Sequence, residues 1–146
     1  MDITSANAVL QLTVLGLFPI PVQLQGFAAD DIYDSDDVDA ADTIMGADGK
    51  LSGGVVLAMI AQNIRFQADS PSIPIIDAWY QGQRAAIAVF GAQMNVSLTA
   101  VNTSYQCFNG ILRRWKLLPD AKRVLQPRVA RIEWESIIPT PIGAAG

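Results

Sequence analysis

The sequence predicts a mainly β fold: a β-sandwich or barrel with one flanking α-helix, a long acidic loop and an extended C-terminal tail. Several segments alternate apolar with polar residues, which is the pattern of half-buried strands. Residues 71–90 instead carry apolar residues at helical spacing, and residues 28–48 are too rich in aspartate for a strand or a helix interior. Because the sequence shows no internal repeat and no domain boundary, we expect residues 1–146 to form a single domain.

Two strands are predicted near the start of the chain, over residues 9–14 and 22–27, on either side of two prolines. In each strand, aliphatic residues alternate with polar ones, so that one face is apolar and the other is polar. The polar face is uncharged in both strands and consists of Gln11, Thr13, Gln23 and Gln25. These strands are therefore expected to build a sheet whose outer face is polar without being charged.

The acidic segment over residues 28–48 is predicted to be a long loop or arm, and it ends in a turn signal. Asp48-Gly49 is typical of a tight β-hairpin and predicts that residues 43–45 pair with the strand that follows. Further strand-like runs cover residues 55–60 and 64–68. The acidic segment is therefore expected to lead directly into strands.

A single helix is predicted over residues 71–90. Ser70 is a good N-cap with Pro71 in the first helical position, and Gly91 is the expected end. One helical face is apolar apart from Gln83, and its apolar members are Ile76, Trp79, Tyr80, Ile87 and Phe90. We therefore expect the helix to pack this face on the sheet.

The second half of the chain returns to strands. Residues 93–100 and 129–136 alternate between two faces, and a further strand over residues 105–115 contains Asn109-Gly110, which predicts a bulge or turn. Prolines keep the tail at residues 137–146 extended, and its apolar composition disfavours free exposure to water.

The composition indicates that part of the surface is covered by protein. Of all residues, 51% are hydrophobic and 16% are charged, whereas soluble domains average roughly 25% charged. Lipid is the weaker candidate, because the uncharged segments over residues 3–29 and 85–112 are interrupted by polar residues. Neither segment offers the roughly 20 consecutive apolar residues of a membrane-spanning helix. We therefore expect protein neighbours and no membrane.

Residues suited to catalysis or metal binding are scarce. The chain contains no histidine, the commonest general base, and its single cysteine, Cys107, is best explained as a small core residue. Residues 46–52 lack the spacing of a phosphate-binding loop, and Glu133 and Glu135 alternate with Arg131 on an outward row. No catalytic, cofactor-binding or metal-binding residue is therefore predicted, and the protein is not expected to be an enzyme.

The acidic segment does not match a calcium-binding EF-hand loop. Counted from Asp34, such a loop needs oxygen ligands at its first, third and fifth positions, glycine at the sixth and glutamate at the twelfth. Asp34 and Asp36 fit, but Val38, Asp39 and Met45 occupy the other three positions. A solvated or partner-facing arm is therefore favoured over a loose site for a hard cation.

Charge is segregated along the chain. Residues 1–73 hold ten acids and two bases, and residues 74–146 hold four acids and eight bases. The basic stretch over residues 113–131 can be interpreted as a nucleic-acid patch, but the whole chain is acidic. Because each subunit carries both an acidic and a basic segment, the acidic segment of one copy can bind the basic segment of the next in a head-to-tail contact. The candidate residues for this contact are the acids Asp30, Asp31, Asp34, Asp36, Asp37 and Asp39 and the bases Arg113, Arg114, Lys116, Lys122 and Arg123.

Four segments of the chain resemble the tail tube proteins of long-tailed bacteriophages, in particular contractile-tailed ones. These segments are Val9–Asp39, Met45–Ser52, Gln67–Ser72 and Ala121–Glu135. The resemblance implies a β-sandwich or barrel with a flanking helix, six copies of which join their sheets into a ring. It also implies that the rings stack head to tail into a hollow tube, a conduit for genome delivery. No functional residue of the family transfers to a position of this sequence.

The resemblance further implies partners and a location. The subunit is expected to bind copies of itself and tail sheath, baseplate and terminator proteins, in the tail of a virion assembled in the host cytoplasm. Genomic DNA is expected to pass through without specific binding, since a neutral or acidic lumen does not attract phosphate. On this hypothesis, the acidic and basic candidates meet across the interface between rings. The candidates for the lumen wall or a ring seam are Gln11, Thr13, Gln23 and Gln25.

Three alternatives remain open. A tail terminator or head–tail connector ring shares the phage context but ends polymerisation. A type VI-like secretion tube or a phage-tail-like bacteriocin shares both the fold and the ring. A small cytosolic β-barrel binding module or enzyme belongs to a different class, and the lack of histidine and of a nucleophile constellation argues against an enzyme.

Overall fold

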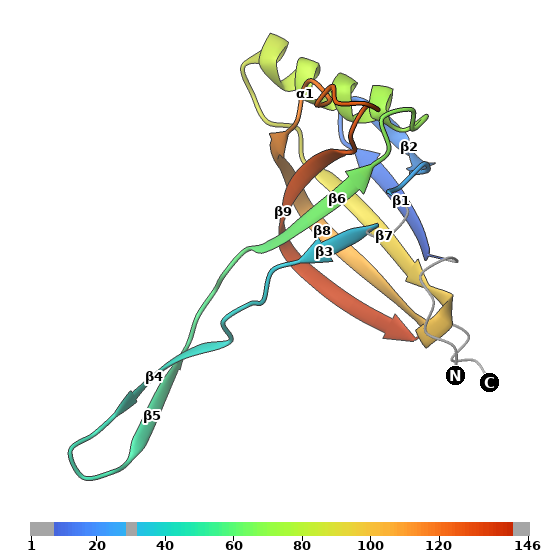
Figure 1. Ribbon diagram of the computed structural model, residues 1–146. Coiled ribbons are helices and arrows are strands. Elements are labelled where there is room, and N and C mark those ends of the chain that lie inside the picture. The colour runs from blue at the N-terminus through green and yellow to red at the C-terminus, as the bar shows by residue number, and fades with distance from the viewer. Residues whose placement is uncertain (1–7, 29–31, 142–146) are drawn as a thin grey trace.

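A computed structural model of the chain describes residues 8–28 and 32–141 (Figure 1). These residues form nine β-strands, one α-helix and one short 3-10 helix. Seven strands belong to one sheet: β1 (Ala8–Val14), β2 (Phe18–Gln23), β3 (Tyr33–Ser35), β6 (Ile60–Phe66), β7 (Ala92–Leu98), β8 (Thr103–Trp115) and β9 (Arg128–Pro141). The remaining elements are the separate strand pair β4 (Ala41–Met45) and β5 (Leu51–Val55), helix α1 (Ile73–Ala86) and the 3-10 helix (Thr99–Val101).

The large sheet is antiparallel, with the strand order β2-β1-β7-β8-β9-β6-β3. It curls strongly, and α1 lies across one end of the curl (Figure 1). Its edge strands, β2 and β3, do not pair with each other in the described residues. Instead, the segment after β2 reaches β6, where the Ala28 N–H donates to the Arg65 carbonyl at 3.0 Å. The prediction of a mainly β fold with one flanking helix is confirmed, in the form of an open sheet and not a closed barrel.

The hydrophobic core fills the concave side of the sheet. Every second side chain is buried in the second half of β1 and in the first half of β9, as the alternation of the sequence predicts. Trp79 of α1 and Trp134 of β9 are both fully buried. Other core residues are Leu10, Leu12, Val14, Ile64, Phe66, Ile76, Met94, Val96 and Ile132. Each large side chain of this kind stabilises the fold by about 1.5–3 kcal/mol, so the packing of the helix on the sheet is a principal source of stability.

The second strand lies upstream of its predicted position. It is predicted at residues 22–27, after Pro19 and Pro21, whereas β2 itself contains both prolines. The reason is that β2 is an edge strand, which pairs only with β1. Proline lacks an N–H donor, and an edge strand tolerates it where that donor would face away from the sheet. Gln25 consequently lies beyond the strand, where its N–H donates to Ser72 Oγ at 2.7 Å.

Helix α1 is shorter than predicted at both ends. Residues 71–90 are predicted to be helical, but α1 follows the N-cap residue Ser72 and ends at Ala86. It ends there because Ile87 adopts a left-handed conformation, with φ of 50° and ψ of 45°. Ile87 is 91% exposed and does not belong to the buried face of the helix, which corrects the prediction.

Two segments predicted as a loop and a tail are partly strand. Within residues 28–48, β3 pairs with β6, and β4 pairs with β5 across the predicted Asp48-Gly49 turn. The hairpin prediction is confirmed, and Gly49 has a φ of 82°, which glycine adopts readily. Residues 137–141 are extended as predicted, but they continue β9 and pair with the start of β8. Residues 142–146 lie outside the described part of the chain.

A bulge in β8 places a glycine against a tryptophan. Asn109 has a φ of 51°, and the register between β7 and β8 shifts there, as the Asn109-Gly110 pair predicts. Gly110 lies directly opposite Trp134 of β9, and a Cβ atom on Gly110 would overlap the indole ring. The indole N–H of Trp134 donates to Gln62 Oε1 in β6 at 3.0 Å. This buried side chain therefore connects β8, β9 and β6.

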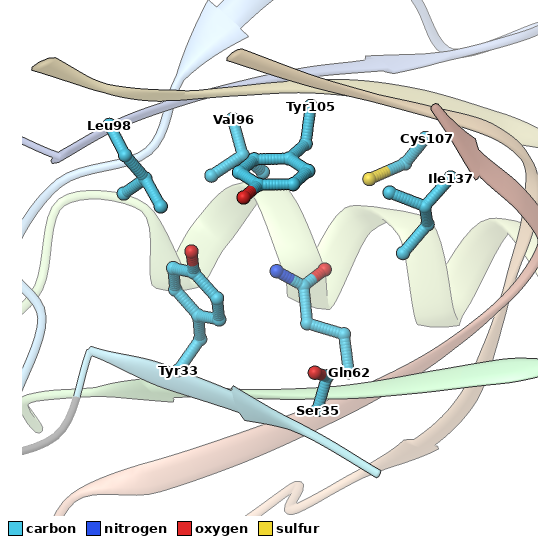
Figure 2. Close-up of a pocket in the computed structure, with 8 residues that line it drawn as sticks. All are labelled: Tyr33, Ser35, Gln62, Val96, Leu98, Tyr105, Cys107 and Ile137. Carbon is cyan, nitrogen blue, oxygen red and sulfur yellow. The ribbon is translucent and has the colours of Figure 1, made fainter. Parts of the chain in front are cut away.

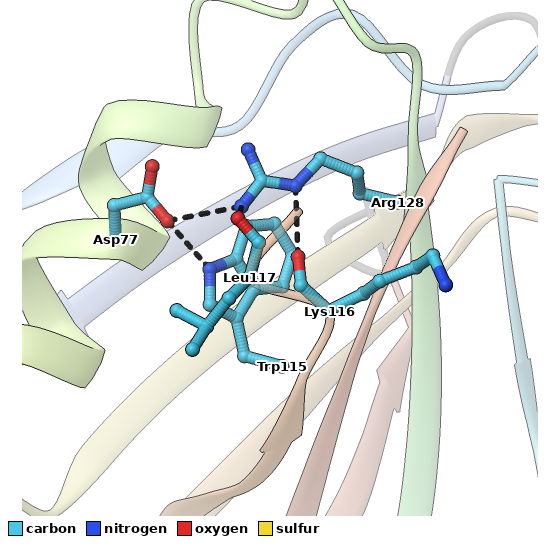
Figure 3. Close-up of polar contacts among 5 residues, drawn as sticks. All are labelled: Asp77, Trp115, Lys116, Leu117 and Arg128. Atoms are coloured by element: carbon cyan, nitrogen blue, oxygen red, sulfur yellow. Dashed lines mark hydrogen bonds and ion pairs between the residues drawn. The ribbon is translucent and has the colours of Figure 1, made fainter. Parts of the chain in front are cut away.

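A polar cluster fastens α1 to the connection between β8 and β9 (Figure 3). Arg128 is 6% exposed, and its guanidinium donates to the carbonyls of Lys116 and Leu117, both at 2.8 Å. Asp77 of α1 accepts from Arg128 at 3.2 Å and from the indole N–H of Trp115 at 2.6 Å. The guanidinium also lies 4.4 Å from the Trp115 ring centroid. Because a buried cation needs a counter-charge, Asp77 fixes the position of α1.

Replacing Gly110 with alanine is expected to lower the free energy of unfolding by about 2 kcal/mol, because the added methyl group overlaps the ring of Trp134. Urea denaturation followed by tryptophan fluorescence measures the change. Gly54→Ala is the matched control, since a Cβ atom at that exposed position meets nothing within 4 Å. Equal stabilities of the two variants would show that Trp134 does not occupy this space.

Replacing Asp77 with alanine is expected to lower the free energy of unfolding by about 1–3 kcal/mol, because the buried guanidinium of Arg128 loses its counter-charge. Asp120→Ala is the control, since it removes only an exposed pair with Lys116 at 3.1 Å, for which less than about 1 kcal/mol is expected. Urea midpoints of the two variants provide the comparison. A loss in Asp120→Ala as large as in Asp77→Ala would contradict a specific role of the cluster.

Candidate functional site

An arm formed by residues 36–59 projects from the sheet between β3 and β6 (Figure 1). It contains the β4–β5 hairpin and the connections on either side. Every residue of both strands is exposed, and the two strands pair only with each other. A two-stranded hairpin is marginally stable by itself in water. The arm therefore has the properties of a segment that packs on another molecule.

One face of the arm is apolar. Met45 lies directly opposite Leu51, and Ala41 lies opposite Val55, so these four side chains share a face. Three of them are large and exposed, with exposed fractions of 61% for Met45, 64% for Leu51 and 86% for Val55. Thr43 and Gly53 stand between the two apolar pairs, and the opposite face carries Asp42 and Ile44. Exposed large apolar side chains gathered on one hairpin mark an interaction site.

Two predicted inter-subunit acids are paired inside the chain. Asp34 in β3 accepts from the amide of Asn63 at 2.9 Å and from Arg65 at 2.8 Å. These two hydrogen bonds hold the pKa of the Asp34 carboxyl below its usual value. Asp36 accepts from Arg131 of β9 at 3.3 Å. Both carboxylates therefore brace the base of the arm against the sheet.

Two predicted inter-subunit bases also have partners inside the chain. Arg113 of β8 lies 3.4 Å from Glu133 of β9, and Lys116 lies 3.1 Å from Asp120 in the connection between the same strands. Arg113, Lys116 and Asp120 are at least 40% exposed, and ion pairs near the surface contribute little to stability, whereas the Glu133 side chain is only 11% exposed. Arg113 and Lys116 therefore remain accessible to a partner.

The other charged candidates have no ion pair within the described residues. They are the acids Asp37 and Asp39 of the arm and the bases Arg114, Lys122 and Arg123, all exposed. Asp30 and Asp31 lie outside residues 8–28 and 32–141. Among the ion pairs of the described chain, none joins a predicted acid to a predicted base. Their inter-subunit contact stays a prediction.

The polar residues predicted for a lumen wall or ring seam are partly brought together. Gln11 of β1 lies directly opposite Gln23 of β2, so the two side chains share a face. Thr13 lies opposite Gln93 of β7 on the same outer face. Gln25 lies beyond β2 and does not join this row.

The uncharged row continues across residues that sequence reasoning did not select. Gln11 lies opposite Asn95 of β7, and Asn95 accepts a hydrogen bond from the side chain of Gln106 in β8 at 3.1 Å. Ser97 and Ser104 form the next pair on this face. Their alternation is visible in the sequence, but only the register shows that they extend the same row. We call the outer face of β2, β1, β7 and the start of β8 the neutral half.

The other half of the outer face is charged. Its strands are the rest of β8 with β9, β6 and β3, and its ion pairs are Arg65–Asp34, Arg113–Glu133 and Arg131–Asp36. The sheet therefore divides along β8 into a neutral half and a charged half. Two surfaces of such different chemistry favour different neighbours.

The concave side of the sheet contains a cavity of about 310 Å³. It is lined by Tyr33, Ser35, Gln62, Val96, Leu98, Tyr105, Cys107 and Ile137 (Figure 2). Burial raises the pKa of the Cys107 thiol to about 12. Burial, with smaller contributions from Tyr105 and Cys107, also raises the pKa of Tyr33. The thiol is therefore protonated at neutral pH, and the cavity presents no activated nucleophile.

Residues 8–28 and 32–141 contain no group of three or more histidine, cysteine, aspartate or glutamate side chains placed to hold a metal ion. The same residues form no helix that is long and apolar enough to cross a membrane. Helix α1 has 14 residues, whereas a membrane span takes roughly 20.

A second cavity lies beside the connection between β8 and β9, and sequence reasoning did not identify it. This cavity, which we call the hollow, measures about 470 Å³ and is lined by Gln67, Ala68, Asp69, Val124, Leu125 and Pro127. The connection exposes Val124 by 68% and Leu125 by 57%, and it also exposes Leu117 and Leu118. Paired apolar residues between prolines are the available sequence signal, but their exposure is visible only in the structure. The hollow is therefore a second apolar surface open to a partner.

Solved structures with the same fold come from contractile injection systems. A chain of the anti-feeding prophage baseplate has a TM-score of 0.63 at 9% identity, with 98% of each chain covered. A chain of the anti-feeding prophage cap has a TM-score of 0.61 at 10% identity, covering 97% of this chain and 92% of that chain. A chain of the PVC sheath-tube complex in the extended state has a TM-score of 0.59 at 10% identity, covering 91% and 88%. At these identities the likeness shows the fold.

The family of the chain is identified by a sequence comparison. No curated protein matches the chain in sequence. The model of the family described as tail fiber protein gp32 matches residues 1–138. The predicted resemblance to tail proteins is thereby confirmed. Because the match extends over nearly the whole sequence, the chain belongs to the tail fiber protein gp32 family.

Proposed function

We propose that the chain is a non-enzymatic structural subunit that forms six-membered rings, which stack into the tube of a phage tail or related injection system. The observation that carries this proposal is the arm, an exposed hairpin with an apolar face on a member of a tail protein family. Such an arm is stabilised when it lies on a neighbour. A contact between unlike surfaces of identical chains closes into a ring or continues as a stack.

The neutral half of the sheet supports a role in the lumen of the tube. Amide and hydroxyl groups, such as those of Gln11, Thr13 and Gln23, carry no net charge and do not retain phosphate as lysine or arginine would. In this proposal they line the lumen, and genomic DNA passes without specific binding. Gln25 lies beyond β2 and apart from the row, and in this proposal it belongs to a ring seam.

The charged candidates support stacking between rings. Asp37 and Asp39, with Asp30 and Asp31, meet Arg114, Lys122 and Arg123 of the next ring in this proposal. Complementary charge of this kind sets register and orientation more than affinity. Sheath, baseplate and terminator proteins complete the assembly, which is located in the tail of a virion built in the host cytoplasm.

A second candidate is a ring that ends the tube. The neighbours in fold include chains from a baseplate, a tube-terminating cap and a sheath/tube terminator, with TM-scores of 0.63, 0.61 and 0.58. The chain from the sheath-tube complex scores 0.59, within the same range. A terminator or connector ring would form by the same lateral contacts and stop there. Negative-stain microscopy of the purified chain separates the two candidates, because stacked rings support the tube and isolated rings support the terminator.

Replacing Leu51 and Val55 together with aspartate is expected to abolish stacking while the subunit stays folded, because both side chains lie on the exposed apolar face of the arm. Sedimentation and negative-stain microscopy measure the stacked fraction, and circular dichroism checks the fold. Ser52→Asp, on the opposite face of the same strand, is the matched control and is expected to leave most stacks intact. Normal stacks from the double variant would contradict a role of the arm in assembly.

A further inference from the structure

We infer that the cavity on the concave side of the sheet binds a small neutral molecule that joins an apolar body to a carbonyl oxygen. This inference goes beyond the proposed function and does not depend on it, because the whole site lies within one subunit. The cavity measures about 310 Å³, at the lower end of the range of ligand pockets. Its ligand is therefore expected to be compact.

A buried amide turns an unused donor into this cavity. Gln62 of β6 is 3% exposed, and its Oε1 accepts from the indole N–H of Trp134 at 3.0 Å. Because an indole N–H can only donate, this bond fixes which end of the amide is the oxygen. Figure 2 shows the Nε2 group on the other side, directed toward the two tyrosine rings. It has no hydrogen-bond partner within residues 8–28 and 32–141, so a ligand at this point has to supply an acceptor.

Two tyrosines add donors beside the amide. Tyr33 of β3 and Tyr105 of β8 come from opposite walls, and their hydroxyls lie on the same side of the cavity as Gln62 Nε2 (Figure 2). Burial, with smaller contributions from Tyr105 and Cys107, raises the pKa of Tyr33, so this hydroxyl is protonated at neutral pH and available to donate. Several neutral donors around one space suit a carbonyl oxygen, which accepts more than one hydrogen bond.

The other part of the wall is apolar. Val96 and Leu98 of β7, Cys107 of β8 and Ile137 of β9 line it. A water molecule in a cavity needs two to four polar partners, which these side chains do not offer. An apolar body that displaces water from this part gains free energy by the hydrophobic effect. The two parts of the wall together therefore favour a ligand with one polar and one apolar end.

The chemistry of the wall also requires the ligand to be neutral. Among the lining residues that the structure describes, none is aspartate, glutamate, lysine or arginine. Burying an ion without a counter-charge costs far more than burying an amide whose oxygen is hydrogen-bonded. A carboxylate of the same shape is therefore expected to be rejected.

Calorimetric titration of the purified full-length chain with benzamide tests the inference. Benzamide has a ring and a neutral carbonyl, benzoate has the same shape with a charge, and acetamide has the carbonyl without the ring. We expect benzamide to bind and to raise the unfolding temperature, with benzoate and acetamide at least about tenfold weaker. Absence of benzamide binding, or equal binding of benzoate, would overturn the inference.

A variant that fills the cavity locates the bound probe. Val96→Phe places a larger side chain in the space and is expected to abolish the benzamide signal, while circular dichroism stays native. Val89→Phe is the matched control, because Val89 is 61% exposed and lies outside the cavity. If Val96→Phe bound benzamide as tightly as the control, the probe would occupy another place and the inference would fail.

The role of the amide is tested by Gln62→Met, which keeps the length of the side chain and removes the donor. Benzamide is expected to bind about threefold to tenfold more weakly, whereas toluene, a ring without a carbonyl, changes less than about twofold. Tyr105→Phe removes a hydroxyl without touching the bond to Trp134 and is expected to show the same selective loss. Tyr80→Phe, in α1 and outside the cavity, is its control. Equal losses for benzamide and toluene in both cavity variants would overturn recognition of a carbonyl.

Discussion

The pairing of β8 with β9 is the constraint on which the rest of the structure depends. The two strands pair from Thr103 opposite Pro141 to Trp115 opposite Ala130. Trp134 crosses β8 only because Gly110 leaves room for its ring. The other five strands of the sheet join this pair, on the sides of β7 and β6. The same pair of strands anchors the helix, since Arg128 begins β9 and Trp115 ends β8, and both hold Asp77.

The sequence predicts the parts of the fold that are periodic. β1, β7 and the first half of β9 alternate between core and surface, and their burial follows that alternation. The position of β2 is not predictable in this way, because its prolines fit only a strand known to lie at an edge. The end of α1 cannot be predicted from the sequence pattern for a different reason. Helical spacing continues past Ala86, whereas the left-handed conformation of Ile87 ends the helix.

The candidate site is less predictable than the fold, because it depends on long-range register. The acidic and basic segments are evident in the sequence, but Asp34 and Arg65 are 31 positions apart and Asp36 and Arg131 are 95 positions apart. These contacts appear only when the sheet is assembled. The apolar face of the arm also depends on how β4 pairs with β5. Leu51 lies opposite Met45 in the observed register, and a shift of one residue would turn it to the other face.

The position of the arm at one end of β6 gives any stack built through it a polarity. One end of such a stack would present free hairpins, and the other would present the surface that receives them. A protein that closes the first end has to accept an acidic, apolar hairpin, whereas a protein that closes the second has to supply one. The two ends of the stack would therefore bind different proteins. One protein can start the stack and another can limit its length, without any change in the repeating subunit.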